Sequence, residues 1–132
     1  MSIILIVDDS QPNRTLTEMI LRNAGYSTCV ACDGVEALEV INQKRPDLVL
    51  LDLHMPRMNG WELARYLKKD TALRAIPLIA LTGHGNFSEE AEFASANWAG
   101  YLSKPFDILE LVETVQQCIR VQPYLGAVAV AS

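Results

Sequence analysis

Apolar residues gather in three short, unbroken runs along the chain, at residues 3–7, 48–51 and 76–81. Each run ends in a polar cluster, as expected for strands of a parallel sheet that are buried on both faces. Two weaker stretches, residues 26–31 and 99–103, suit flanking or edge strands. The pattern therefore predicts five strands.

Between the first two strands the apolar positions recur at helical spacing. The predicted helix begins near Pro12 and ends before Gly25, a residue type that commonly follows a helix C-terminus. Its apolar positions are Leu16, Met19, Ile20 and Ala24. The spacing thus predicts a first helix.

Two acid-x-x-Glu pairs, Asp33 with Glu36 and Asp107 with Glu110, are typical of the capping boxes that open helices. The apolar positions of these helices are Ala37, Leu38 and Ile41 in the first case and Ile108, Leu111, Val112 and Val115 in the second. A further helix is predicted by Gly60, Leu63, Ala64 and Leu67, and a poorly amphipathic one by residues 88–96. Strict alternation of strands and helices implies a parallel sheet covered on both faces, with its functional site at the carboxyl ends of the strands.

The composition fits a single globular domain, because 50% of the 132 residues are hydrophobic and 20% are charged. The chain has 16 acidic and 11 basic residues, and no basic stripe that would follow a nucleic-acid backbone. We therefore expect no direct nucleic-acid binding. The apolar runs at residues 3–7 and 125–131 are too short to span a membrane, so we expect a cytoplasmic protein.

Cys29 and Cys32 form a C-x-x-C pattern, which can mark a redox or metal site. A redox pair usually lies at a helix N-terminus, where the thiol pKa is lowered, whereas these residues lie in or beside a predicted strand. His54 and His84 lie too far beyond Cys32 for a zinc-finger spacing. We therefore predict ordinary thiols and no structural zinc site.

Polar residues follow four of the five predicted strands. They are Asp8 and Asp9 after the first strand, Asp52 after the third, Thr82 after the fourth and Lys104 after the fifth. Taken singly, each has an ordinary explanation as a turn former, a helix cap or a surface charge. Their joint placement at the ends of four strands favours a functional site.

The three carboxylates would repel one another in one pocket unless a cation were present. Mg²⁺ prefers oxygen ligands of this kind and leaves coordination positions for phosphate oxygens. Lys104 can supply an ammonium and Thr82 a hydroxyl to a phosphoryl group, while Asp52 can act as the nucleophile that forms an aspartyl phosphate. The residues thus predict a magnesium-dependent phosphorylation site.

These residues and the short motifs around them resemble the receiver domain of response regulators. The motifs are Met55-Pro56 followed by Gly60, then Thr82-Gly83, and finally Lys104-Pro105-Phe106. The resemblance places a receiver domain at residues 1–121 and a C-terminal tail at residues 122–132. It implies a flavodoxin-like (βα)5 fold of the α/β class, with a doubly wound, five-stranded parallel sheet in the order 2-1-3-4-5.

The resemblance also implies a role for each site residue. Asp52 would accept phosphate from a histidine kinase or a histidine phosphotransfer protein, and the first helix would dock that phosphodonor. Asp8, Asp9 and Asp52 would hold Mg²⁺ together with a main-chain carbonyl of His54. Lys104 would contact the phosphate, and the Lys104–Pro105 peptide would be cis.

A second set of expectations concerns the output of the signal. By resemblance, Thr82 and Tyr101 form a switch pair that changes the surface of the fourth helix, fifth strand and fifth helix for a partner that the sequence does not identify. We expect no membrane association and a monomer or weak homodimer. The chain departs from the family pattern at Trp98, where a small residue is usual. A repacked core around the indole is favoured over an exposed ring that anchors a partner, but both stay open.

Two other functions use similar chemistry. A phosphohydrolase of the haloacid dehalogenase type also has an Asp nucleophile and Mg²⁺, but it needs a second Asp two residues later, where this chain has Ser10 or His54. A flavodoxin-like FMN binder needs a Ser/Thr-rich phosphate cradle after the first strand, where this chain has two carboxylates. We therefore expect a phosphoacceptor signalling domain rather than an enzyme, with the phosphohydrolase as the alternative.

Overall fold

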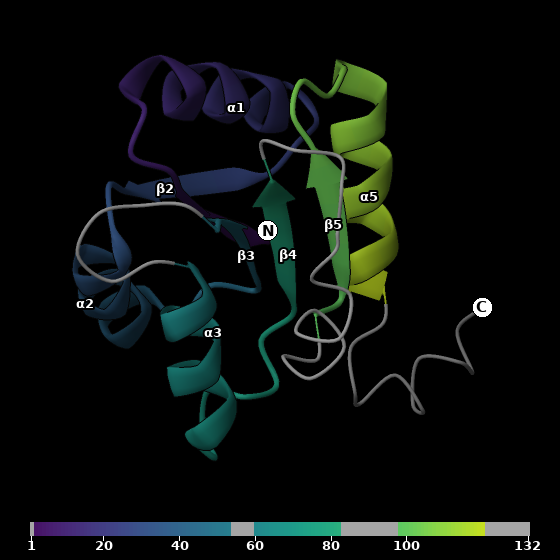
Figure 1. Ribbon diagram of the computed structural model, residues 1–132. Helices are drawn as coiled ribbons and strands as arrows, with labels where there is room; N and C mark the ends of the chain where they lie inside the picture. Colours follow the sequence, from purple (N-terminus) through teal and green to yellow (C-terminus); the bar gives the residue numbers. More distant parts are fainter. Residues whose placement is uncertain (1, 54–59, 83–97, 121–132) are drawn as a thin grey trace, which may run out of the picture.

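The computed structural model describes residues 2–53, 60–82 and 98–120 (Figure 1). These ranges contain five strands: β1 (Ile3–Val7), β2 (Ser27–Ala31), β3 (Leu48–Asp52), β4 (Leu78–Thr82) and β5 (Gly100–Ser103). They also contain four helices: α1 (Gln11–Asn23), α2 (Gly34–Lys44), α3 (Gly60–Lys69) and α5 (Ile108–Arg120). The predicted helix at residues 88–96 lies outside the described residues. None of the described helices is long and apolar enough to cross a bilayer.

All five strands are parallel and follow the order β2-β1-β3-β4-β5, which confirms the predicted topology. β2 and β5 each begin one residue later than predicted. The predicted start of β4 at Ile76 was wrong. The amide of Ile76 donates to the carbonyl of Leu73 in the preceding turn, and Pro77 has no N–H to donate to the sheet.

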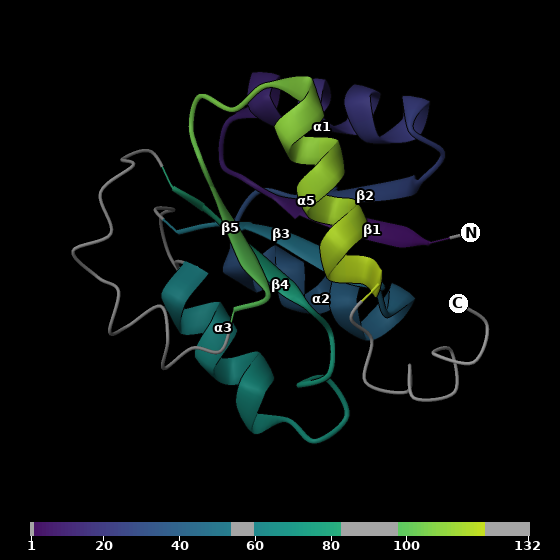
Figure 2. The ribbon, with the colours of Figure 1, turned by 90° about the vertical axis from the view of Figure 1, so that its right-hand side faces the viewer.

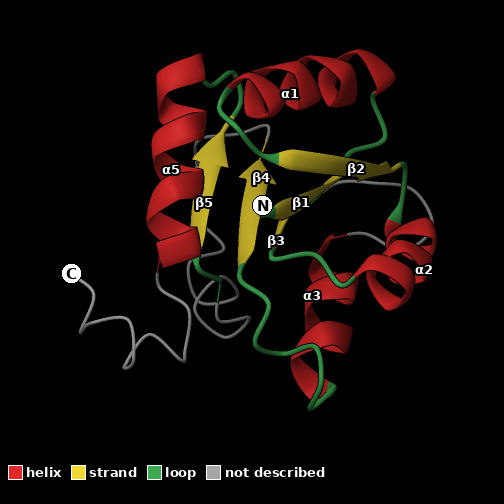
Figure 3. Ribbon diagram, turned by 180° about the vertical axis from the view of Figure 1, so that it is seen from behind, coloured by secondary structure: helices red, strands yellow, loops and turns green. Residues whose placement is uncertain are grey.

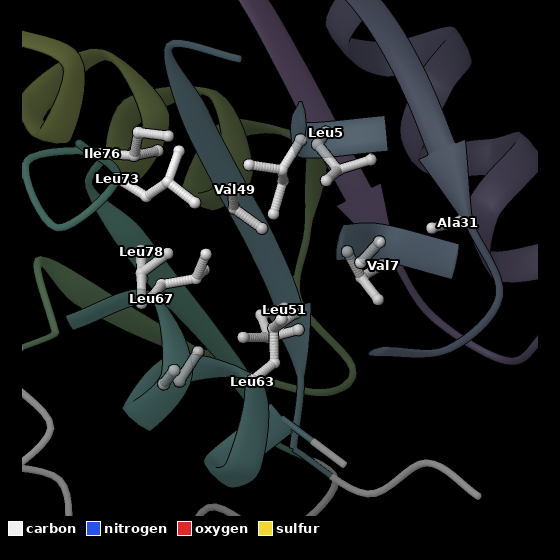
Figure 4. Close-up of a cluster of buried hydrophobic side chains, with 14 of the residues drawn as sticks. Leu5, Val7, Ala31, Val49, Leu51, Leu63, Leu67, Leu73, Ile76 and Leu78 are labelled. Carbon is white, nitrogen blue, oxygen red and sulfur yellow. The ribbon is translucent and has the colours of Figure 1, made fainter. Parts of the chain in front are cut away.

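The sheet separates two hydrophobic cores, because successive side chains of a strand point to opposite faces. Residues such as Leu5, Val49 and Leu51 pack with α2 and α3 on one face. Ile6 and Leu50 pack with α1 and α5 on the other. Figures 2 and 3 show the two pairs of helices on opposite sides of the sheet, and Figure 4 shows the α2/α3 core.

The ends of the helices follow the predicted capping signals. Asp33 and Asp107 each accept a main-chain hydrogen bond from the Glu three residues later. The side chain of Glu110 in turn accepts a hydrogen bond from the amide of Asp107. The side chain of Glu36 instead accepts one from the amide of Cys32, one residue before the cap. Gly25 follows α1 with a φ of 101°, in the left-handed region where glycine is unstrained. The sequence signals therefore placed these helix ends correctly.

The predicted first helix is present as α1, but most of the apolar positions that marked it in the sequence are not its buried ones. Leu16 and Met19 are 57% and 58% exposed, whereas the buried residues of this helix are Thr17 and Leu21. Leu21 belongs to the core shared with α5, and only Ile20 of the predicted set packs against that core. The helix is thus rotated so that a threonine faces inward and two large apolar side chains face solvent.

Trp98, the residue that departs from the family pattern, is buried, with 8% of its surface exposed. It belongs to the α2/α3 core, and its ring meets that of Trp61 edge to face, with centroids 5.8 Å apart and an interplanar angle of 83°. This is a favourable aromatic geometry. The interpretation as a repacked core is therefore confirmed.

Replacing Trp98 with alanine should lower the free energy of unfolding by about 3–5 kcal/mol, because it leaves a cavity lined by Trp61 and the α2/α3 core. Urea denaturation followed by circular dichroism measures this loss. Tyr66→Ala, which removes a half-exposed aromatic ring of α3, is the matched control and should cost less than about 1 kcal/mol. Equal denaturation midpoints for the two variants would contradict a core role for Trp98.

Candidate functional site

Three carboxylates meet where β1 and β3 end. Val7 is paired with Leu51, so the next residues, Asp8 and Asp52, come side by side. One carboxylate oxygen from each of Asp8, Asp9 and Asp52 lies within 4.8 Å of the others. Asp8 and Asp52 are buried, whereas Asp9 is exposed. Negative charges at this spacing repel one another, and the cluster favours any cation that can enter it.

The pleat of the strands explains why the charged side chains converge. Asp8, Asp52 and Lys104 each follow by two positions a residue of the α1/α5 core: Ile6, Leu50 and Leu102, respectively. Because side chains alternate along a strand, these positions project toward the same face of the sheet. The side chains of Asp8, Asp52 and Lys104, which come from three separate strand ends, therefore lie on the same face of the sheet.

Lys104 supplies the positive charge of this cluster. Its Nζ lies 2.9 Å from Oδ2 of Asp8 and 3.3 Å from Oδ2 of Asp52. Burial alone would lower the pKa of Lys104, but the hydrogen bond to Asp8 and the charges of Asp52 and Asp8 outweigh it and raise the pKa. The ammonium is therefore held charged between two buried carboxylates. The expected cis peptide between Lys104 and Pro105 is present.

Gly60 lets α3 begin directly against the backbone of Asp52. A Cβ atom at this position would lie 2.4 Å from the carbonyl oxygen of Asp52 and 2.8 Å from Cα of Leu53. The amide of Gly60 also donates to the carbonyl of Leu53, at 3.3 Å. The sequence singled out this glycine as part of a motif but did not show why it is needed. Because glycine has no side chain, the end of β3 can lie close to the start of α3.

The two residues of the expected switch pair lie on neighbouring strands. Thr82 ends β4 and is buried, whereas Tyr101 of β5 is 51% exposed. Tyr101 is registered with Ala80, and Thr82 with Ser103. The pair therefore lies on neighbouring strands, offset by two residues, with a buried threonine and an exposed ring.

Several predicted features lie outside the described residues. They are His54, the Met55-Pro56 motif and Gly83. No metal cluster other than the one formed by the three aspartates is found in the described part of the chain. The described part of this cluster therefore consists of three carboxylates.

The C-x-x-C pattern has the properties of ordinary thiols. Burial raises the pKa of Cys29, and a hydrogen bond with Glu36 is the main cause that raises the pKa of Cys32. A redox pair needs the opposite shift, because the thiolate is the reactive form. All three cysteines, Cys29, Cys32 and Cys118, are free.

Sequence reasoning missed a hollow beside the charged cluster. It has a volume of about 420 Å³ and is lined by Asp8, Asn13, Leu16, Thr17, Lys104, Pro105 and Phe106. Because of the orientation of α1 about its axis, Leu16 lines this hollow and Met19, one turn further along the helix, is exposed. The sequence does not show that Leu16 and Met19 face solvent, so it gave no sign of this apolar surface.

Known proteins are similar to this chain in sequence and in fold. The family model described as response regulator receiver domain matches residues 4–116. The polar-differentiation response regulator DivK of Brucella anthropi is 34% identical over 123 residues, covering 93% of this chain and 95% of that protein.

Solved structures agree. A putative response regulator from Chloroflexus aurantiacus has a TM-score of 0.85 and 32% identity, covering 89% of this chain and 97% of that one. The chemotaxis response regulator CheY4 of Vibrio cholerae has a TM-score of 0.84 and 31% identity, covering 89% and 98% of the two chains. On its sequence, its fold and the residues at its strand ends, this chain belongs to the response regulator receiver family of signalling domains.

Proposed function

We propose that the chain is a phosphorylation switch in which Asp52 accepts a phosphoryl group from a histidine kinase or a histidine phosphotransfer protein. The observation that carries the proposal is the Lys104 ammonium, held between the buried carboxylates of Asp8 and Asp52. A structural ion pair needs one carboxylate, whereas Lys104 pairs with two, and an oxygen of a third, Asp9, lies within 4.8 Å of oxygens of both. An excess of carboxylates over cations fits a site that takes up a metal ion.

The proposed metal is Mg²⁺, held by Asp8, Asp9 and Asp52, with a main-chain carbonyl of His54 as a further ligand. The donor set fits this ion, since all three side chains offer oxygen and none offers sulfur or imidazole nitrogen. When bound, Mg²⁺ offsets the negative charge of the phosphoryl oxygens. Asp9 is exposed, so the ion has a route from solvent that the buried aspartates do not block.

The reaction itself is a nucleophilic displacement at phosphorus. A carboxylate oxygen of Asp52 forms a bond to phosphorus while the bond from phosphorus to the donor's imidazole nitrogen breaks, and that nitrogen keeps the electron pair. Lys104 then exchanges its contact with Asp52 for one with a phosphoryl oxygen. The hydroxyl of Thr82 donates to another. No proton has to leave Asp52, because it reacts as the carboxylate.

The proposed output depends on Thr82 and Tyr101. Movement of the Thr82 hydroxyl toward the phosphoryl group frees space next to β5, and the exposed Tyr101 ring turns into that space. The surface formed by β5 and α5 changes as a result. A downstream partner that contacts this surface would distinguish the two states.

The proposed docking surface for the phosphodonor is the outward face of α1. Exposed Leu16 and Met19 offer apolar contact area there, and the hollow between α1 and the loop at Pro105 and Phe106 opens next to the charged cluster. A donor bound at this face would hold its phosphohistidine close to Asp52.

The remaining proposals follow from the sequence. We propose that residues 1–121 form the receiver domain and residues 122–132 a tail, and that the protein acts in the cytoplasm without binding nucleic acid. A monomer or weak homodimer is proposed, with an unidentified downstream target. The phosphohydrolase alternative is set aside, because the receiver-domain family model matches residues 4–116 and the chain has Ser10 or His54 where that class needs its second Asp.

Phosphorylation is tested with Mg²⁺ and acetyl phosphate, a small acyl phosphate that replaces the protein donor. Intact-protein mass spectrometry should find one added phosphoryl group that hydroxylamine removes, and excess EDTA should prevent its addition. Asp52→Asn should gain none, because an amide is a poor nucleophile. A phosphate that survives this substitution, or forms equally well in EDTA, would contradict the assigned nucleophile or metal.

Lys104→Met should lower the metal-free free energy of unfolding by about 1–3 kcal/mol, because it leaves two buried carboxylates without their shared cation. The raised pKa of Lys104 keeps it charged at neutral pH, and its contribution is lost only as pH rises through that pKa, above 10.5. Urea denaturation should thus give the same difference at pH 7 and pH 9. Lys69→Met, an exposed lysine of α3, is the control. No difference between the two variants would remove Lys104 from the cluster.

Thr82→Ala should still be phosphorylated on Asp52, since the nucleophile and the carboxylate cluster are intact. It should lose the phosphate-dependent change around Tyr101, because the hydroxyl that moves toward the phosphate is gone. Two-dimensional NMR of samples with and without phosphate measures both effects. Equal shifts of the Tyr101 amide in wild type and variant would show that Thr82 does not transmit the signal.

A further inference from the structure

Arg14, in the first turns of α1, contacts the main chain of the carboxylate cluster. Its Nη1 donates a hydrogen bond to the carbonyl oxygen of Asp8 over 2.6 Å, in a partly buried position. The helix holds Arg14 in place, since its amide donates to the carbonyl of Ser10 at 3.0 Å. Sequence reasoning gave this residue no role.

With Arg14, every polar group of Asp8 has a hydrogen-bond partner. The amide of Asp8 donates to the carbonyl of Ala31, Oδ1 accepts from the amide of Ser10, and Oδ2 accepts from Lys104. The Arg14 bond completes the set at the carbonyl. Asp8 is therefore fixed at both its side chain and its main chain.

The side chain of Asp9 is not held in the same way. Among the described residues no hydrogen bond or ion pair holds its carboxylate, although this group completes the cluster with Asp8 and Asp52. The carbonyl of Asp8 and the Cα atom of Asp9 belong to the same planar peptide unit. A bond that orients this carbonyl therefore also sets where the side chain of Asp9 begins. Arg14 is the only side chain of the described residues that bonds this carbonyl.

We propose that Arg14 is a positioning residue for the divalent cation: by bonding the carbonyl of Asp8, it orients the peptide that carries Asp9 toward the cation. The inference rests on the proposed magnesium site. The role proposed for Arg14 involves no contact with the phosphoryl group or with the reacting carboxylate of Asp52.

The charge of Arg14 has the opposite effect to its hydrogen bond. A guanidinium close to the cluster repels a metal ion, so its charge alone weakens metal binding. Loss of the hydrogen bond should therefore weaken metal binding when Arg14 is replaced, whereas loss of the charge alone should strengthen it.

The experiment measures the dissociation constant of the metal-site ion in the full chain, without phosphate. Mn²⁺ is titrated and its free fraction is read by electron paramagnetic resonance, and Mg²⁺ is measured by competition at constant ionic strength. Arg14→Met, which keeps an unbranched, flexible side chain but removes the charge and the donor, should bind about tenfold more weakly, as is usual when an outer partner of a ligand is lost. Tighter or unchanged binding would overturn the proposal.

Two further variants complete the design. Arg22→Met removes the same charge from the other end of α1, where the side chain is 63% exposed and pairs with Glu18, and should leave the constant within about twofold, since exposed charges are screened. Arg14→Lys keeps the charge but not the planar donor, and should bind more weakly than wild type; a purely electrostatic role requires no change. Absence of binding by wild type would overturn the magnesium site and this inference together. Binding by wild type that Arg14 variants leave unchanged would overturn this inference alone.

Discussion

The repulsion between two buried carboxylates, Asp8 and Asp52, is the constraint on which the site depends. Neighbouring strands of a parallel sheet lie about 4.8 Å apart, so an aspartate at the end of each is forced close to the other. Burial removes the water that would screen them. The fold meets this cost with a lysine from a third strand end, and Lys104 reaches both carboxylates only because β5 lies on the same side of β1 as β3 and β4.

The surroundings hold this unfavourable arrangement in place. The pleat turns the three charged side chains to one face, Gly60 brings α3 against the backbone of Asp52, and Arg14 bonds the carbonyl of Asp8. The pleat and Gly60 do not lower the repulsion itself. They restrict the motions by which the carboxylates would otherwise separate, and so keep the cluster ready for a cation.

Most of the fold could be predicted because its signals are local. Unbroken apolar runs marked the buried strands, and the Asp33 and Asp107 caps marked helix starts. The inner face of α1 could not be predicted, because Leu16 and Met19 fit helical spacing as well as the residues that are buried, and only packing against α5 decides the rotation. Arg14 was missed for a related reason. A side chain that bonds a main-chain carbonyl leaves no periodic or charge-pair signal in the sequence.

The site residues that end or follow a strand were easier to identify than those that support them. Asp8, Asp52 and Lys104 were found because parallel strands bring their carboxyl ends to one edge. Gly60 could be listed but not explained, since the need for a missing side chain appears only when the distance to the Asp52 carbonyl is known.

The edge-to-face pair of Trp61 and Trp98 also has a spectroscopic consequence. These are the only two tryptophans of the chain, and both belong to one core, where Trp61 directly follows the glycine that abuts Asp52 and Trp98 leads into β5. Intrinsic fluorescence excited at the red edge of the indole band therefore comes from a single location. Its intensity and wavelength report on the contact between the start of α3 and the entry to β5, without any label.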